Sequence, residues 1–111
     1  LADAGADLIV GHHPHVVQPI ERFGTTLVLY SLGNTVFDQY FSEAVQTGLL
    51  AGLGVDEAGW YVTLYPITSQ HSRHQPQLLH GEARRTALAA LASSSAPVLR
   101  SAIRAGTLRL P

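Results

Sequence analysis

The sequence predicts an α/β fold in which short strands end in polar loops and a β-hairpin precedes a C-terminal helix. Three observations support this prediction. An apolar run at residues 6–10 is followed at once by a histidine-rich loop. Two strand-like segments at residues 45–55 and 60–67 flank an acidic, glycine-containing turn, and residues 82–93 are rich in Ala, Leu and Arg. Strand-length apolar runs combined with a helical pattern are typical of layered α/β domains.

The first half of the chain contains two predicted sheet strands. Residues 6–10 carry small and apolar side chains on both faces, as expected inside a parallel or mixed sheet. Residues 26–32 are the strongest strand by β-branched and apolar content, and they stop at Gly33 and Asn34, which favour left-handed backbone. Residues 18–23 predict a turn or a short strand. We expect residues 6–10 and 26–32 to be neighbours in one sheet.

A β-hairpin is predicted over residues 45–67. Its centre, residues 56–59, has an acidic start and a final glycine, which suit a type I turn followed by a left-handed residue. In the second strand, Tyr and Thr alternate with Trp, Val and Leu, so one face should be more buried than the other. The polar residues 69–77 predict a loop.

The last third of the chain predicts helices. Residues 82–93 include two leucines three positions apart, which form an apolar stripe on a helix. The serine-rich residues 93–97 should end it, and a last short helix is expected over residues 98–105. Residues 107–111 predict either a strand or a loose tail.

Length and composition fit one small domain or part of a larger one. The 111 residues include seven basic and eight acidic side chains, scattered along the chain, so neither nucleic acid nor an anionic membrane is a favoured partner. There is no Cys, which excludes disulfides and thiolate chemistry. No apolar run approaches the roughly 18 residues of a membrane span. Residues 1–5 read as the last turn of a helix closed by Gly5, so we expect the C-terminal piece of a longer protein.

The strongest candidate for a functional site is the segment Gly11-His12-His13-Pro14-His15, directly behind the first strand. Imidazole is the commonest metal-ligating side chain. Pro14 favours an extended backbone at His13, so His13 and His15 should point to one side and His12 to the other. The alternative is a turn whose rings only bond backbone carbonyls. Because burying several imidazoles without partners is costly, metal binding is the better interpretation.

Weaker candidates lie outside this loop. Asn34 follows the second strand and either lies near a substrate or simply belongs to a turn. Asp38 either orients a ligating imidazole or caps a turn. His71 and His74, near Arg73, lie in a polar loop where histidines are more often solvated than ligating.

Two segments carry a resemblance to a known family: AGADLIVGHHPHVVQPIE at residues 4–21 and LYSLGNTVFDQ at residues 29–39. They resemble the C-terminal half of the bacterial capsule synthesis, poly-gamma-glutamate (CapA-type) family, which is related to calcineurin-like metallophosphoesterases. The resemblance covers residues 1–67 closely and extends loosely through residues 82–93. It implies that residues 1–95 are the C-terminal part of a metallophosphoesterase-like layered α/β sandwich, and that residues 96–111 are a tail or short helix.

The same resemblance implies a site for divalent metal ions. The superfamily ends its ligand set with a Gly-His-x-His loop after a strand, which assigns His13 and His15 to a metal pair, with His12 substituting for or assisting His13. Manganese, iron and zinc are not distinguished. Asn34 and Asp38 take substrate or supporting roles in this scheme. The other ligand motifs of the superfamily lie upstream of these residues, so the chain alone is expected to be inactive.

Partners and setting also follow from the resemblance. The implied partners are the missing N-terminal half of the same chain and other capsule-synthesis subunits at the membrane, in the cell envelope. The implied function is metal-dependent hydrolysis in capsule or poly-gamma-glutamate production. Two alternatives stay open: a non-catalytic assembly subunit of a membrane polymer-synthesis complex, and a metal-dependent phosphatase or hydrolase unrelated to capsule.

Overall fold

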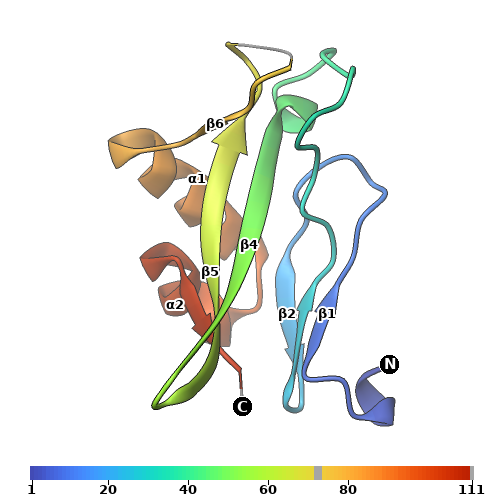
Figure 1. Ribbon diagram of the computed structural model, residues 1–111, viewed down its shortest axis with the longest axis vertical. Helices are drawn as coiled ribbons and strands as arrows, with labels where there is room; N and C mark the ends of the chain where they lie inside the picture. Colours follow the sequence, from blue (N-terminus) through green and yellow to red (C-terminus); the bar gives the residue numbers. More distant parts are fainter. Residues whose placement is uncertain (72–73, 111) are drawn as a thin grey trace.

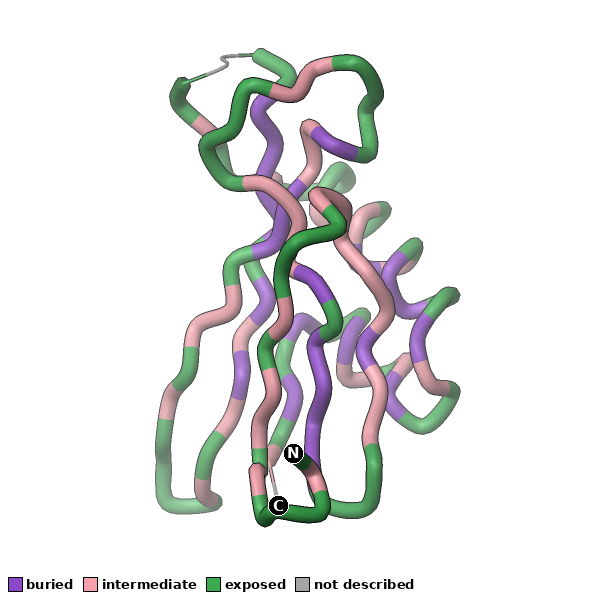
Figure 2. The backbone as a smooth tube through the Cα atoms, turned by 90° about the vertical axis from the view of Figure 1, so that its right-hand side faces the viewer, coloured by how far each residue is buried: buried purple, intermediate pink, exposed green. Residues whose placement is uncertain are grey.

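The strands of the chain form two sheets, and the helices cover one side of them (Figure 1). The computed structural model describes residues 1–71 and 74–110, which contain two α-helices and seven strands. Both α-helices lie on the same side of the strands, as a view turned by 90° also shows (Figure 2). The predicted α/β fold with a β-hairpin and a C-terminal helix is therefore confirmed.

The first sheet has the strand order β1-β3-β2. In it, β1 (Leu8–Val10) is parallel to β3 (Thr26–Leu29), and β2 (Ile20–Phe23) is antiparallel to β3. The expectation that residues 6–10 and 26–32 contribute neighbouring strands is confirmed by the pairing of β1 with β3. However, β3 ends three residues before the predicted end, because Leu32 and Gly33 leave the ladder and form isolated bridges with other segments.

The second sheet is built on the predicted hairpin. Its strands β4 (Thr47–Asp56) and β5 (Gly59–Thr68) are antiparallel and paired along their whole length. The turn between them matches its sequence, because Asp56 accepts the N–H of Ala58 at 2.9 Å and Gly59 has a φ of 105°. A residue that must adopt positive φ is most easily glycine.

The C-terminal residues belong to the second sheet through β7 (Thr107–Arg109), which pairs with β5. Arg109 also reaches the hairpin turn, where its Nη1 lies 2.6 Å from Oδ1 of Asp56. Hydrogen bonds from the Arg109 guanidinium lower the pKa of the Asp56 carboxyl, since they favour its ionised form. The short β6 (Gln77–Leu78) pairs with the other end of β5. Of the two expectations for the last residues, the strand is correct for residues 107–109.

The longer helix, α1 (Gly81–Ser94), buries Leu88 and Leu91, the two leucines of the predicted stripe. It ends where the buried Ser95 links it to the first sheet. The Ser95 hydroxyl donates to the carbonyl oxygen of Leu91 at 2.7 Å and accepts the N–H of Ile20 at 2.9 Å. This link anchors the end of α1 to the start of β2.

The C-terminal segment packs into the same core as α1. The 3-10 turn η3 (Pro97–Leu99) leads into α2 (Arg100–Ala105), and Ile103 is fully buried beside the residues of both sheets. The chain begins with another 3-10 turn, η1 (Ala2–Ala4), which Gly5 closes as expected. The division of the chain expected at residue 96 stays a prediction about domain organisation.

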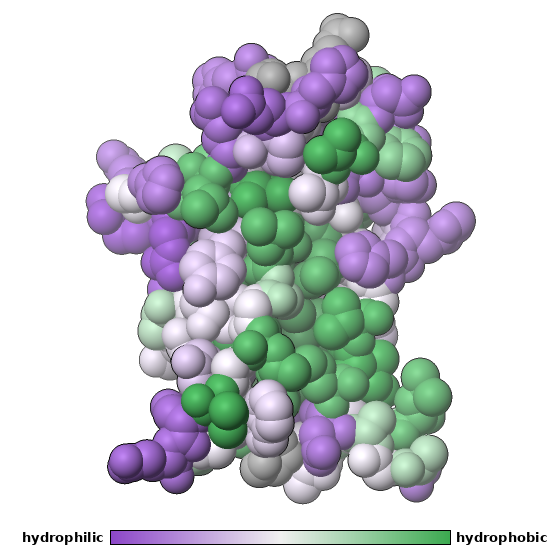
Figure 3. Space-filling model, in the orientation of Figure 1, coloured by the Kyte–Doolittle hydropathy of each residue, from purple (hydrophilic) through white to green (hydrophobic). Residues whose placement is uncertain are grey.

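The side of the strands that faces away from the helices is uncovered and partly apolar. In β5, Val62 and Leu64 point toward the helices and are buried, so the residues that alternate with them, such as Tyr65, point the other way. Figure 3 shows apolar side chains gathered across this side. Its exposed apolar residues, which we call the open face, are Phe23, Tyr30, Leu50 and Tyr65. Within the described residues, no helix is long and apolar enough to cross a membrane.

Candidate functional site

The histidine-rich loop leaves the end of β1 beside the end of β3. The N–H of Gly11 donates to the carbonyl oxygen of Leu29 at 2.7 Å, which extends the pairing of β1 with β3 by one residue. A Cβ atom at Gly11 would collide with the carbonyl oxygen of Tyr30, so only glycine permits this close approach. Since the two strands are parallel, the loops at their carboxyl ends meet at one edge of the sheet, where α/β proteins commonly place ligands.

These loops enclose a hollow of about 270 Å³, which we call the histidine hollow. One wall consists of His12, His13 and His15, and the other of residues 33–37, which follow β3. The tertiary structure thus joins both segments that the sequence analysis singled out.

The backbone of the loop is strained at two of its histidines. His13 has a φ of 106° and His15 a φ of 62°, and within residues 1–71 and 74–110 they are the non-glycine residues with positive φ. The predicted extended conformation at His13 is therefore wrong. Between β1 and the bridge of Val17 with Leu32 the chain must reverse its direction, and positive φ is what tight reversals use. Each such residue costs about 1–3 kcal/mol unless it is glycine.

His15 is the most firmly held of the three rings. Its Nδ1 lies 2.9 Å from Oδ1 of Asn34, and the Asn34 amide nitrogen donates to the carbonyl oxygen of Val45 at 3.0 Å. On another side the ring contacts Phe37, with ring centroids 4.6 Å apart and an interplanar angle of 42°. Polar and aromatic contacts together fix its orientation.

His13 lies next to His15 despite the failed prediction about its backbone. Their ring centroids are 6.0 Å apart. His12 and His13 are exposed, whereas His15 is half-buried. His12 also lines the histidine hollow, so the expectation that it faces away from the other two is not supported.

The structure separates the remaining candidates. Asn34 lies in the hollow and contacts His15, whereas Asp38 is exposed and outside the residues that line it. His71 and His74 are exposed and also outside the hollow, and their neighbour Arg73 lies outside the described residues. No sequence pattern points to Phe37 or to the Val45 carbonyl, because each contacts the site only through the packing of distant segments.

The residues of the hollow fit part of a metal site. Two neighbouring imidazoles, one of them bonded through Nδ1 to an amide oxygen, offer nitrogen ligands that suit zinc, iron or manganese to differing degrees. In the part of the chain that the structure describes, no three His, Cys, Asp or Glu side chains are grouped so that they could hold a metal ion. Further ligands would have to come from other residues.

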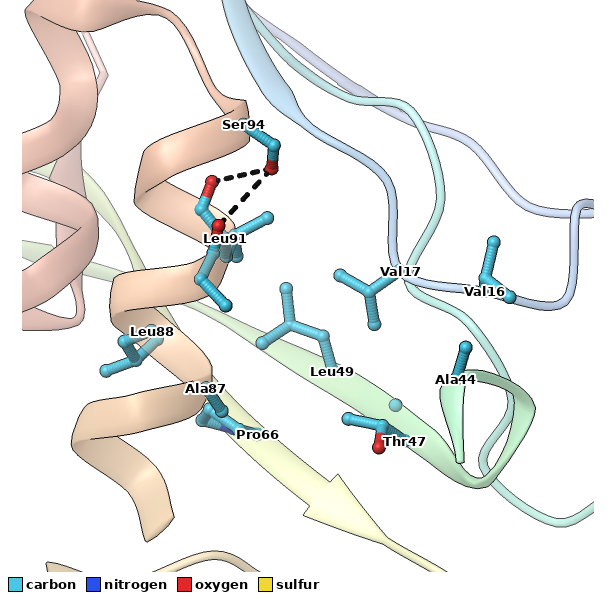
Figure 4. Close-up of a pocket in the computed structure, with 12 residues that line it drawn as sticks. Val16, Val17, Ala44, Thr47, Leu49, Pro66, Ala87, Leu88, Leu91 and Ser94 are labelled. Carbon is cyan, nitrogen blue, oxygen red and sulfur yellow. Dashed lines mark hydrogen bonds between the residues drawn. The ribbon is translucent and has the colours of Figure 1, made fainter. Parts of the chain in front are cut away.

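A larger, apolar cavity of about 310 Å³ lies beside the histidine loop (Figure 4). Val17, Leu49 and Leu91 point into it from the loop, from β4 and from α1. The hydroxyl groups that line it already donate hydrogen bonds to nearby backbone. Ser94 donates to a carbonyl oxygen of α1, and Thr47 donates to the carbonyl oxygen of Glu43. The cavity therefore offers little polar chemistry.

The part of the chain that contains the histidine loop matches a known protein family. Residues 1–39 match the family model described as bacterial capsule synthesis protein PGA_cap. The chain is 54% identical over 50 residues to PGA biosynthesis protein CapA of Bacillus subtilis (strain 168), which covers 45% of this chain and 13% of the relative. It is 37% identical over 76 residues to capsule biosynthesis protein CapA of Bacillus anthracis, which covers 68% of this chain and 18% of the relative. The chain thus spans less than a fifth of the length of these curated relatives.

Proposed function

This chain belongs to the bacterial capsule synthesis (CapA-type) family, and on that premise we propose that it is part of a metallophosphoesterase-like protein of capsule or poly-gamma-glutamate biosynthesis. In this proposal His13 and His15 are ligands of divalent metal ions. The names of the two Bacillus relatives support the pathway, and the matched residues 1–39 include the whole histidine loop.

One observation carries the proposal: both proposed ligands have strained backbone and line the same hollow. Positive φ favours glycine, yet the chain has histidine at both positions. Strained non-glycine residues cluster at functional sites, where the side chain is needed despite the cost of its conformation. Two imidazoles with ring centroids 6.0 Å apart are close enough to serve one metal ion or two adjacent ions.

The chain's own part in the chemistry is binding. His13 and His15 each supply one ring nitrogen, as ligands and not as general bases. Divalent metal ions at such a site supply Lewis-acid chemistry toward a phosphoester or related substrate. Asn34 supports His15, and the apolar Phe37 limits the access of water to one side of the ring.

Other parts of the same protein are the proposed source of the missing ligands. The described residues do not hold a three-ligand group, and the open face leaves apolar side chains exposed. Both features are expected where further chain packs against these strands. The cell envelope is the proposed setting, and polymer-synthesis subunits at the membrane are the proposed partners.

Metal content of single variants tests this proposal. In the intact protein, His15→Ala and His13→Ala should each lose most of the bound metal, whereas His12→Ala should lose less. His80→Ala is the matched control, because His80 is an exposed histidine outside the hollow. If His12→Ala empties the site while His13→Ala leaves it full, His12 is the partner of His15. If all four variants keep the metal content of the parent protein, the proposed site is wrong.

A non-catalytic assembly subunit is the second candidate, favoured by the lack of a three-ligand group within the described residues. Hydrolysis of a simple phosphodiester, bis-p-nitrophenyl phosphate, separates the two functions. Metal-dependent hydrolysis that His15→Ala abolishes supports the phosphoesterase. Metal binding without hydrolysis, together with loss of polymer when the open face is altered, supports the assembly subunit.

A further inference from the structure

We infer that Asn34 is a positioning residue that selects one tautomer of His15, with the proton on Nδ1 and with Nε2 left to bind a ligand. The metal-binding consequence of this inference rests on the proposed function, whereas the tautomer itself does not.

The hydrogen bond to Val45 fixes which way the amide points. A backbone carbonyl oxygen can only accept a hydrogen bond, so the atom of Asn34 that lies 3.0 Å from the Val45 oxygen must be the NH₂ group. The opposite orientation would place two oxygen atoms against each other. The side-chain oxygen of Asn34, Oδ1, therefore faces His15.

The orientation of the amide then determines which ring nitrogen of His15 carries the proton. An amide oxygen only accepts, so Nδ1 of His15, at 2.9 Å from it, must carry the proton and donate. A neutral imidazole has one proton on its two ring nitrogens. Nε2 of His15 is therefore unprotonated, which is the form that a metal ion requires.

The backbone of Asn34 is also held, so the amide has little freedom to move away. Gly33 forms a bridge with Gly48 of β4, and a Cβ atom at Gly48 would collide with the backbone carbonyl oxygen of Asn34. The Val45 carbonyl lies in the 3-10 turn η2 (Ala44–Gln46), directly before the same strand. The start of β4 thus holds the backbone beside Asn34, the preceding turn η2 holds its side chain, and Asn34 holds His15.

Nuclear magnetic resonance of the metal-free intact protein, labelled with ¹⁵N at histidine, tests the inference. The His15 signal is the one that disappears in His15→Gln. At a pH where the rings are neutral, His15 should be mainly the Nδ1-protonated tautomer in the parent protein. Asn34→Ala should shift it toward the Nε2-protonated form, which free imidazole side chains favour. Asn34→Asp should keep the Nδ1-protonated form, because a carboxylate oxygen still accepts a hydrogen bond from Nδ1.

The control is Gln46→Ala. Gln46 also bonds backbone carbonyls of this region, those of Tyr40 and Ser42, but its amide does not contact His15. A general loosening of the loop would move the tautomer in Gln46→Ala as much as in Asn34→Ala, and that result overturns the inference. An Nε2-protonated His15 in the parent protein, or equal behaviour of Asn34→Ala and Asn34→Asp, also overturns it.

Zinc titration of the same variants provides the second readout. Asn34→Ala should weaken zinc binding by about 10- to 100-fold, the usual effect of removing a group that orients a ligating histidine, while Gln46→Ala should leave it unchanged. If the parent protein binds no zinc but the tautomers behave as expected, the proposed function fails and the positioning role stands. If zinc binds equally well to the parent protein and Asn34→Ala, the positioning role fails and the proposed function stands.

Discussion

His13 and His15 combine a backbone that suits glycine with a side chain that glycine lacks. Their φ values of 106° and 62° result from the sharp reversal of the loop between β1 and β2. Glycine would adopt these values without strain, and histidine does not. The chain therefore gives up stability at both positions and gains two imidazoles in one hollow.

This conflict predicts that substitutions at position 13 affect stability and metal binding independently of each other. In the intact protein, His13→Gly should be more stable than His13→Ala by about 1 kcal/mol, because only alanine keeps a Cβ at positive φ. Both variants should lose the same amount of bound metal, because neither has an imidazole. Denaturant unfolding and metal analysis measure the two effects. Equal stability of the two variants would show that His13 does not have positive φ in solution.

At the level of elements, β4 supports the histidine loop although no residue of β4 belongs to it. The bridge from Gly48 to Gly33 and the hydrogen bond from Asn34 to Val45 bring the segment after β3 against the start of β4. That segment in turn contacts His15. The geometry of the proposed site therefore depends on the second sheet as well as on the first.

Gly48→Ala should disturb the hollow from a distance. Its Cβ would collide with the Asn34 carbonyl oxygen, a backbone atom that cannot rotate away, so we expect a destabilisation of about 1–3 kcal/mol and weaker zinc binding. Gly52→Ala is the matched control on the same face of the same strand. Its Cβ would lie 3.1 Å from a ring carbon of Tyr65, which is half-exposed and can move. Equal effects of the two substitutions on zinc binding would contradict the proposed support by β4.

Across the whole molecule, the helices pack against one side of both sheets, and apolar side chains stay exposed on the other side. The core contains residues from β2, β3, β4, β5, β7 and both helices. On the opposite side, Leu50 and Tyr65 face each other across β4 and β5 and remain 40% and 42% exposed. Apolar side chains gathered in this way commonly mark a surface where another part of a protein packs.

The 111-residue chain by itself should therefore bind a hydrophobic dye such as anilinonaphthalene sulfonate and tend to aggregate. Leu50→Gln should reduce the dye signal, because Leu50 belongs to the open face. Val98→Gln is the control, since Val98 is 78% exposed on η3, away from that face. A monomeric chain with a sharp two-state melt and no dye binding would show that the open face needs no cover.

Much of the architecture was predictable because it rests on local patterns. Alternating residues in β5, the glycine at the end of the hairpin turn and the leucine stripe of α1 each specify their element through contacts that recur every two to four residues. The end of β3 was placed wrongly, because Leu32 and Gly33 pair with Val17 and Gly48, which lie far from them in sequence.

For the candidate site, the sequence by itself determined which side chains are present: three histidines behind a strand, and an asparagine behind the next strand of the sheet. It also predicted that the strands before these segments are neighbours in one sheet, whereas the parallel direction that brings the segments to one edge comes from the structure. Only the tertiary structure decided the backbone of His13 and the partner of His15. The reversal between β1 and β2 overrides the local preference that Pro14 imposes on His13. The Asn34–His15 contact spans 19 residues and depends on β4, and no local pattern in the sequence records that packing.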